Sequence, residues 1–95
     1  MAFTVFLTAN ARRDIQEAID WENRRSPGLG RRLFEEIKDM MSRLATNPLS
    51  GTIRYEDVRC RKTEVFSYLL HYLVDEARQT VTVLRVLHTS RKPEL

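Results

Sequence analysis

The side chains best suited to chemistry in this sequence are basic, and they gather near its end. Arg59 and Arg61 alternate in the run VRCRKT, so both project from one side of an extended strand. Arg85 interrupts the apolar face of TVTVLRVLH, and His88 and Arg91 follow where that run ends. Guanidinium groups bind carboxylates and phosphates, and a histidine transfers protons near neutral pH. We therefore predict that these five residues form the active surface.

The excess positive charge of the chain lies in the same C-terminal half as these candidate residues. Residues 58–95 hold seven Lys and Arg against four Asp and Glu, which accounts for the whole formal net charge of +3. A basic face suits an anionic partner such as nucleic acid, a ribosome or an acidic protein segment. The alternative is ordinary surface charge.

Each candidate also has a purely structural interpretation. An arginine on an apolar strand face needs a carboxylate or an anionic ligand. Arg59 and Arg61 would then belong to a solvated strand face, and His88 to sheet packing. The aromatic rings of Tyr68 and Tyr72 and the imidazole of His71 lie in the apolar run from Val65 to Val74, and we expect them to pack in the core. The acids that could hold Arg85 inside the protein are Asp14, Glu22 and Glu64.

Other site types find no support in the sequence. It has no Gly-rich phosphate loop, and His71 and His88 with the single Cys60 do not make a metal site. We expect neither a metal nor a cofactor. One cysteine allows no internal disulfide, and no run approaches the length of a membrane span. We therefore expect a cytoplasmic protein.

The elements that must position these residues follow from periodicity. Apolar residues recur at helical spacing up to Asn47–Pro48 and alternate after it, while Pro27 and Gly28 separate two helices. Thr8 is the expected N-cap of the first helix. The segment 52–57 is either a loop or the entry to a strand. The pattern predicts helices at about 9–24 and 29–46 and strands near 3–8, 58–63, 65–75 and 80–88.

These elements predict one α+β domain over residues 1–95, with the order β-α-α-β-β-β. The short link between the helices favours an antiparallel pair, packed on one face of a largely antiparallel four-stranded sheet. Binding residues are expected on the uncovered face, which twist makes concave, and where the last strand ends. The residues expected in the core include Ile15, Ile37, Phe66, Leu70 and Val83.

The order of these motifs resembles the RelE/ParE superfamily of type II toxins. The similar stretches are FTVFLTANARRDI, SPGLGRRLFEEI, LATNPLSG, VFSYLLHYLVD and VTVLRVLHTSRKP. The resemblance implies the β-α-α-β-β-β fold, an antitoxin that wraps the toxin, and a two-gene operon that regulates itself. We expect an acidic and apolar antitoxin segment over the helices and the basic sheet edge.

Within that superfamily the chain is more similar to the ParE branch, which poisons DNA gyrase. The similarity lies in Phe66–Ser67–Tyr68 and in the ending His88-x-x-Arg91-x-Pro93. It implies a plasmid-stabilisation type of toxin that inhibits bacterial growth, with Arg59, Arg61, Arg85 and Arg91 contacting the target.

The alternative is a ribosome-dependent mRNA endoribonuclease of the RelE type. Arg85, His88 and Arg91 would then be catalytic, with Arg61 among the cations, and the target would be the ribosome and its mRNA. Nucleases of this type carry an arginine where this chain has Tyr68, and a C-terminal tyrosine that is missing here. A toxin-like protein without activity is a third possibility.

Overall fold

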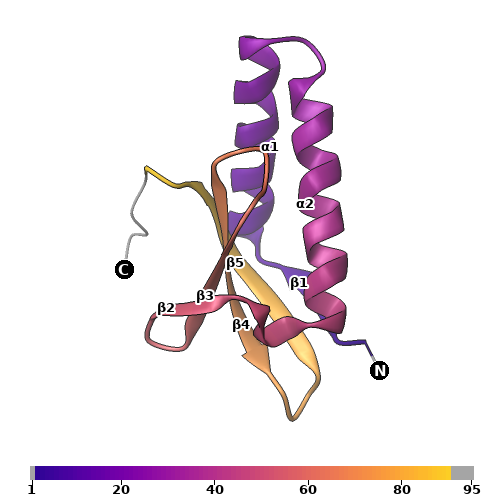
Figure 1. The fold of residues 1–95 in the computed structure, drawn as a ribbon, viewed down its shortest axis with the longest axis vertical. Coiled ribbons are helices and arrows are strands. Elements are labelled where there is room, and N and C mark those ends of the chain that lie inside the picture. The colour runs from indigo at the N-terminus through magenta and orange to yellow at the C-terminus, as the bar shows by residue number, and fades with distance from the viewer. Residues whose placement is uncertain (1, 91–95) are drawn as a thin grey trace.

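Two helices lie side by side against one face of a five-stranded sheet (Figure 1). The structure, a computed structural model, describes residues 2–90. Its elements in chain order are β1 (Thr4–Leu7), α1 (Ala9–Arg25), α2 (Leu29–Thr46), the 3-10 turn η1 (Pro48–Ser50), β2 (Thr52–Tyr55), β3 (Val58–Lys62), β4 (Tyr68–Asp75) and β5 (Thr80–His88).

The helix boundaries lie where the sequence predicts them. Thr8 caps α1, and its Oγ1 accepts a hydrogen bond from the Ala11 amide at 3.0 Å. Helix α1 ends at Arg25, and its C-cap Ser26 has an extended backbone directly before Pro27. Gly28 then takes a φ of +92°, a left-handed conformation that costs glycine little, and α2 begins at the next residue.

The sheet has five strands rather than the four expected from the sequence. Its order is β1-β5-β4-β3-β2; β1 runs parallel to β5 and all other neighbours are antiparallel. The additional strand is β2, in the segment that the sequence left undecided. A turn at Glu56, with φ of +48°, joins β2 to β3. Strand β2 is an edge strand with three exposed residues, so it lacks the apolar alternation that marks a half-buried strand.

Strand β4 begins at Tyr68, and the prediction of a strand from residue 65 was wrong. The carboxylate of Glu36 on α2 accepts the backbone N–H groups of Glu64 and Val65, both at 3.0 Å, and that of Phe66 at 3.4 Å. Because these three amides bind one carboxylate, they are not available for hydrogen bonds to a neighbouring strand, and Glu64–Phe66 forms a loop.

The core lies between the helix pair and the covered face of the sheet. Ile15, Ile37, Leu70 and Val83 are buried as predicted, while Phe66 is only partly buried because it belongs to the loop before β4. Within residues 2–90 no helix combines the length and the apolar character needed to cross a membrane.

We predict that Ile37→Ala and Leu70→Ala each lower the free energy of unfolding by about 2–5 kcal/mol, the range for large-to-small core substitutions. Both side chains are fully buried. Urea denaturation measures the effect, with Val65→Ala as control because Val65 is 76% exposed. Losses below about 1 kcal/mol at both core positions would contradict the packing described here.

Candidate functional site

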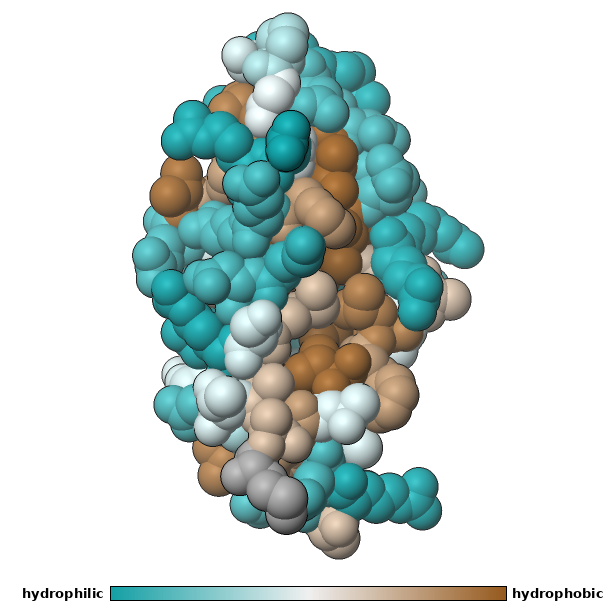
Figure 2. Space-filling model, turned by 90° about the vertical axis from the view of Figure 1, so that its right-hand side faces the viewer, coloured by the Kyte–Doolittle hydropathy of each residue, from teal (hydrophilic) through white to brown (hydrophobic). Residues whose placement is uncertain are grey.

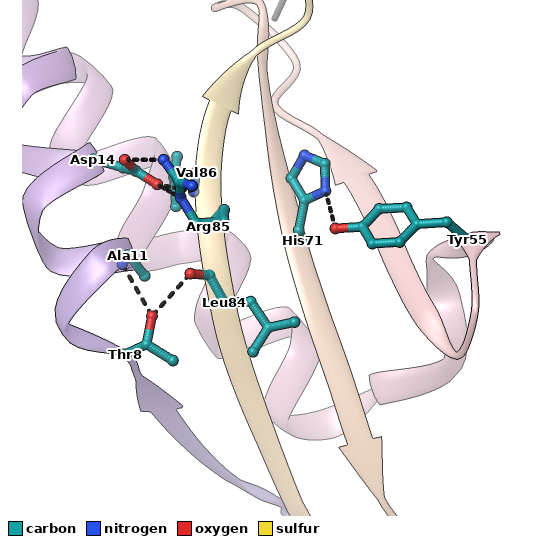
Figure 3. A network of polar contacts seen from close by, with 8 residues as sticks. All are labelled: Thr8, Ala11, Asp14, Tyr55, His71, Leu84, Arg85 and Val86. Atoms are coloured by element: carbon teal, nitrogen blue, oxygen red, sulfur yellow. Dashed lines mark hydrogen bonds and ion pairs between the residues drawn. The ribbon is translucent and has the colours of Figure 1, made fainter. Parts of the chain in front are cut away.

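Helix α1 completes the edge of β5 where β1 ends. The Thr8 amide donates to the Val83 carbonyl at 3.1 Å, and the Thr8 hydroxyl donates to the Leu84 carbonyl at 2.8 Å. Asp14, six residues after Thr8, accepts a hydrogen bond from the Val86 amide at 3.0 Å (Figure 3). Thr8, the N-cap of α1, and Asp14 on α1 thus replace a neighbouring strand as hydrogen-bond partners of the β5 backbone.

Arg85 is held by the same carboxylate. Its Nε lies 2.7 Å from Asp14 Oδ2 and its Nη2 lies 3.1 Å from Oδ1, a bidentate ion pair. The Asp14 side chain is 6% exposed and that of Arg85 27%. Of the three acids that the sequence offered, Asp14 is the one that pairs with Arg85, and its negative charge offsets the guanidinium.

His88 lies at the end of β5 and packs on an aromatic ring. Its imidazole meets the ring of Tyr68 edge-on, with centroids 5.5 Å apart, and its Nδ1 lies 2.9 Å from the Ser90 hydroxyl. The Tyr68 hydroxyl donates to the buried carboxylate of Glu22 at 3.1 Å. Burial, and then this hydrogen bond, raise the pKa of Tyr68 to about 12. Tyr68 therefore stays protonated and acts as a hydrogen-bond donor.

These groups border a groove between α1 and β5. Its volume is about 570 Å³. Its floor is mostly apolar, and exposed Trp21 stands at its rim with the Arg24 guanidinium 5.7 Å from the ring centre. His88 is the imidazole that faces this groove. The groove is lined by Asp14, Glu17, Ala18, Asp20, Trp21, Arg24, Tyr68, Val86, Leu87, His88 and Ser90.

Arg59 and Arg61 lie elsewhere, on the face of the sheet that the helices cover. They stand opposite Tyr72 and Leu70 of β4, which belong to the core. Each arginine binds the segment around η1. Arg59 Nη1 donates to the Gly51 carbonyl at 2.8 Å, and Arg61 Nη1 donates to the Ser50 hydroxyl at 2.9 Å.

The structure therefore does not bring all the predicted site residues together. Arg85 and His88 both belong to β5, but Arg85 stands opposite His71 and His88 opposite Tyr68, so their side chains project from different faces of the sheet. Arg59 and Arg61 lie on β3, with β4 between them and β5. Arg91 lies outside the described residues. The roles of these residues in binding or catalysis stay a prediction.

A buried polar network on the opposite face of the sheet was missed. His71 Nδ1 lies 3.1 Å from the Tyr55 hydroxyl and 3.3 Å from Cys60 Sγ. The other ring nitrogen, Nε2, is buried and has no hydrogen-bond partner within residues 2–90. The alternation of the strands could have suggested that Cys60 and His71 share a face, but not that they are neighbours.

Both titrating groups at the centre of this network are held neutral. Burial, followed by the charges of Arg85 and Arg54, lowers the pKa of His71 from its usual 6.5. Burial raises the pKa of the Cys60 thiol. The neutral forms keep the hydrogen bonds to Nδ1. In the part of the chain that the structure describes, no group of three or more His, Cys, Asp or Glu side chains could hold a metal ion.

The sequence matches one family over nearly its whole length. That family is described as the ParE toxin of the type II toxin-antitoxin system parDE, and the match covers residues 5–93. No curated protein matches the chain.

Solved structures with the same fold come from toxin–antitoxin systems. A chain of the chromosomal ParDE system of P. aeruginosa is 16% identical, with a TM-score of 0.79 over 92% of this chain and 96% of that one. The RelBE2 complex of Mycobacterium tuberculosis contains a chain that is 28% identical, with a TM-score of 0.67 over 93% and 99%. For the E. coli RelBE complex the values are 19% and 0.72 over 95% and 100%.

We predict that Asp14→Ala destabilises the protein by about 3 kcal/mol, the lower end of the range for a buried ion pair that loses one partner. The substitution also leaves the Val86 amide without its acceptor. Guanidinium denaturation measures the loss. Asp39→Ala is the matched control: it removes another helical aspartate paired with an arginine, but that pair is exposed and screened by water, so stability changes little. Equal effects for the two variants would refute the special role of Asp14.

We also predict that the protein loses stability as the pH falls below about 6.5. The unfolded chain protonates His71 near this usual value, whereas the folded protein does so only at lower pH. Below pH 6.5 the unfolded state therefore binds more protons, and the free energy of unfolding decreases.

The measurement is the free energy of unfolding between about pH 8 and pH 5. His71→Asn keeps a polar group near the position of Nδ1 but does not titrate, so the variant shows the pH dependence that comes from the other titrating groups. The slope should be steeper for the unsubstituted protein than for the variant. Identical slopes would show that His71 does not contribute.

Proposed function

The chain belongs to the ParE toxin family of type II toxin–antitoxin systems, and we propose that it inhibits bacterial growth by binding DNA gyrase. In this proposal it acts in the cytoplasm without a cofactor, as in a plasmid-stabilisation system, and a cognate antitoxin neutralises it. The observation that carries the proposal is the match to ParE toxins over residues 5–93. The likeness in fold to a chain of the ParDE system supports it.

The placement of the arginines supports a binding surface rather than a catalytic centre. Cleavage of RNA needs a general base, a general acid and a cation that stabilises the charge developing on the phosphate. Arg85 is instead paired with Asp14, and Arg59 and Arg61 donate to the segment around η1. Cations fixed in this way present a surface of defined shape, which suits recognition of a protein or DNA surface.

A RelE-type ribosome-dependent endoribonuclease is the second candidate. The observation in its favour is the 28% identity to a chain of the RelBE2 toxin–antitoxin complex. His88, whose imidazole is of a type that can transfer a proton near neutral pH, borders the groove between α1 and β5. In this reading His88, Arg85 and Arg91 act on RNA.

We predict that the purified protein inhibits DNA supercoiling by gyrase and traps cleaved DNA, while leaving translation in a cell-free extract unaffected. Both assays use the same preparation, and the same protein with its antitoxin added is the control. Inhibition of translation with cleavage of ribosome-bound mRNA, together with normal supercoiling, would establish the second candidate instead.

The substitution His88→Ala separates the two candidates further. A gyrase inhibitor that binds through a broad surface should keep most of its growth inhibition, because no single contact is indispensable. An RNase that uses His88 should lose about 10²-fold or more in cleavage rate, the range for one lost acid–base group. Thr89→Ala, the exposed neighbour, is the matched control, and thermal unfolding checks that both variants fold.

A further inference from the structure

An exposed tryptophan stands at the rim of the groove between α1 and β5. Trp21 is the only tryptophan of the chain, and 53% of its surface is exposed. Tryptophan is highly buried on average, and it is enriched among the residues that carry most of the binding energy of protein interfaces. The lining beside it includes the apolar side chains of Ala18 on α1 and Val86 on β5. This combination suits a partner side chain with a long aliphatic stem.

The polar groups deeper in the groove are already engaged. The Tyr68 hydroxyl donates to Glu22 at 3.1 Å, and the same carboxylate binds Arg25 at 2.9 Å. Asp14 is paired with Arg85. Tyr68 therefore presents its ring rather than its hydroxyl to the groove, and recognition by charge is left to the rim.

The carboxylates of the rim are not neutralised by a neighbour. Glu17, Asp20 and Arg24 lie three or four residues apart on the face of α1 that borders the groove. Neither Glu17 nor Asp20 takes part in an ion pair within residues 2–90. Two carboxylates against one guanidinium leave an excess of one negative charge at this rim, on a chain whose formal net charge is +3.

A second groove, between β1 and α2, has the opposite charge. Its volume is about 490 Å³, and its charged lining residues are Arg12 and Lys38. It lies on the side of the molecule that Figure 2 shows, where apolar side chains gather between hydrophilic margins. The two grooves therefore suit segments of opposite charge. Glu17 and Asp20 would repel an acidic segment, such as the one expected of the antitoxin, and equally the phosphates of a nucleic acid.

We propose that gyrase inserts a cationic side chain, carried by an otherwise apolar segment, into the groove between α1 and β5. The aliphatic stem of this lysine or arginine packs against Trp21 and Val86, and its charged head lies at the carboxylates of Glu17 and Asp20. The inference rests on the proposed function, because it takes gyrase as the partner. It adds an acidic and aromatic docking point to a surface that is otherwise basic.

The affinity for gyrase tests the aromatic part of this contact. The probe is the purified gyrase holoenzyme, and its binding to the toxin and to variants is measured by biolayer interferometry. Trp21→Ala should weaken binding about tenfold or more, as expected for an interface hot spot. Phe34→Ala is the matched control and should bind like the unsubstituted protein. Phe34 is also an aromatic residue on a helix, 42% exposed, with the Lys38 ammonium 5.5 Å from its ring centre.

Charge reversal tests the rim. Glu17→Lys combined with Asp20→Lys should weaken binding about tenfold or more, because the new cations repel the cationic side chain. The matched control, Glu35→Lys combined with Asp39→Lys, makes the same change in net charge on exposed acids of α2 and should not weaken binding. Thermal unfolding checks that the variants fold. Glu17→Gln combined with Asp20→Asn, a milder change expected to weaken binding severalfold, carries the test if the lysine variant does not fold.

The outcomes separate the inference from the proposed function. Unchanged gyrase affinity in the folded Trp21→Ala and Glu17→Lys/Asp20→Lys variants would overturn the inference and leave gyrase inhibition intact. Absence of gyrase binding by the unsubstituted toxin would overturn the proposed function and the inference with it. Loss of antitoxin binding but not of gyrase binding in these variants would identify the antitoxin as the occupant. Self-association that Trp21→Ala abolishes, with gyrase affinity unchanged, would identify a second copy. Either of the last two results refutes the proposal.

Discussion

The packing of α1 on the sheet depends on which groups form hydrogen bonds with the backbone of β5 beyond the end of β1. Strand β1 pairs with residues 80–83 of β5. Beyond them, the side chain of the N-cap Thr8 binds the Leu84 carbonyl and Asp14 of α1 binds the Val86 amide. Asp14 accepts a strand amide and a bidentate arginine at the same time. Because a buried backbone N–H without a partner is costly, this carboxylate fixes how α1 lies on the sheet. The groove between α1 and β5 follows from that placement.

Local signals made the helices and most strands predictable. Pro27, Gly28 and Asn47–Pro48 act within a few residues, so the sequence places the helix ends nearly where the structure has them. The sequence did not predict the loop before β4 or strand β2, because both depend on contacts with residues outside the segment itself. The loop before β4 needs Glu36, which lies 28 residues before the first amide it binds. Strand β2 is defined by pairing with β3 rather than by its own composition.

The candidate site was predictable in residue types but not in arrangement. Alternation correctly placed Arg59 and Arg61 on one side of their strand. Which face of the sheet that side becomes depends on the register with β4, and a shift of one residue would reverse it. The need of Arg85 for an acid was likewise evident from its apolar neighbours. The identity of that acid required the parallel pairing of β1 with β5, which brings α1 back across the edge.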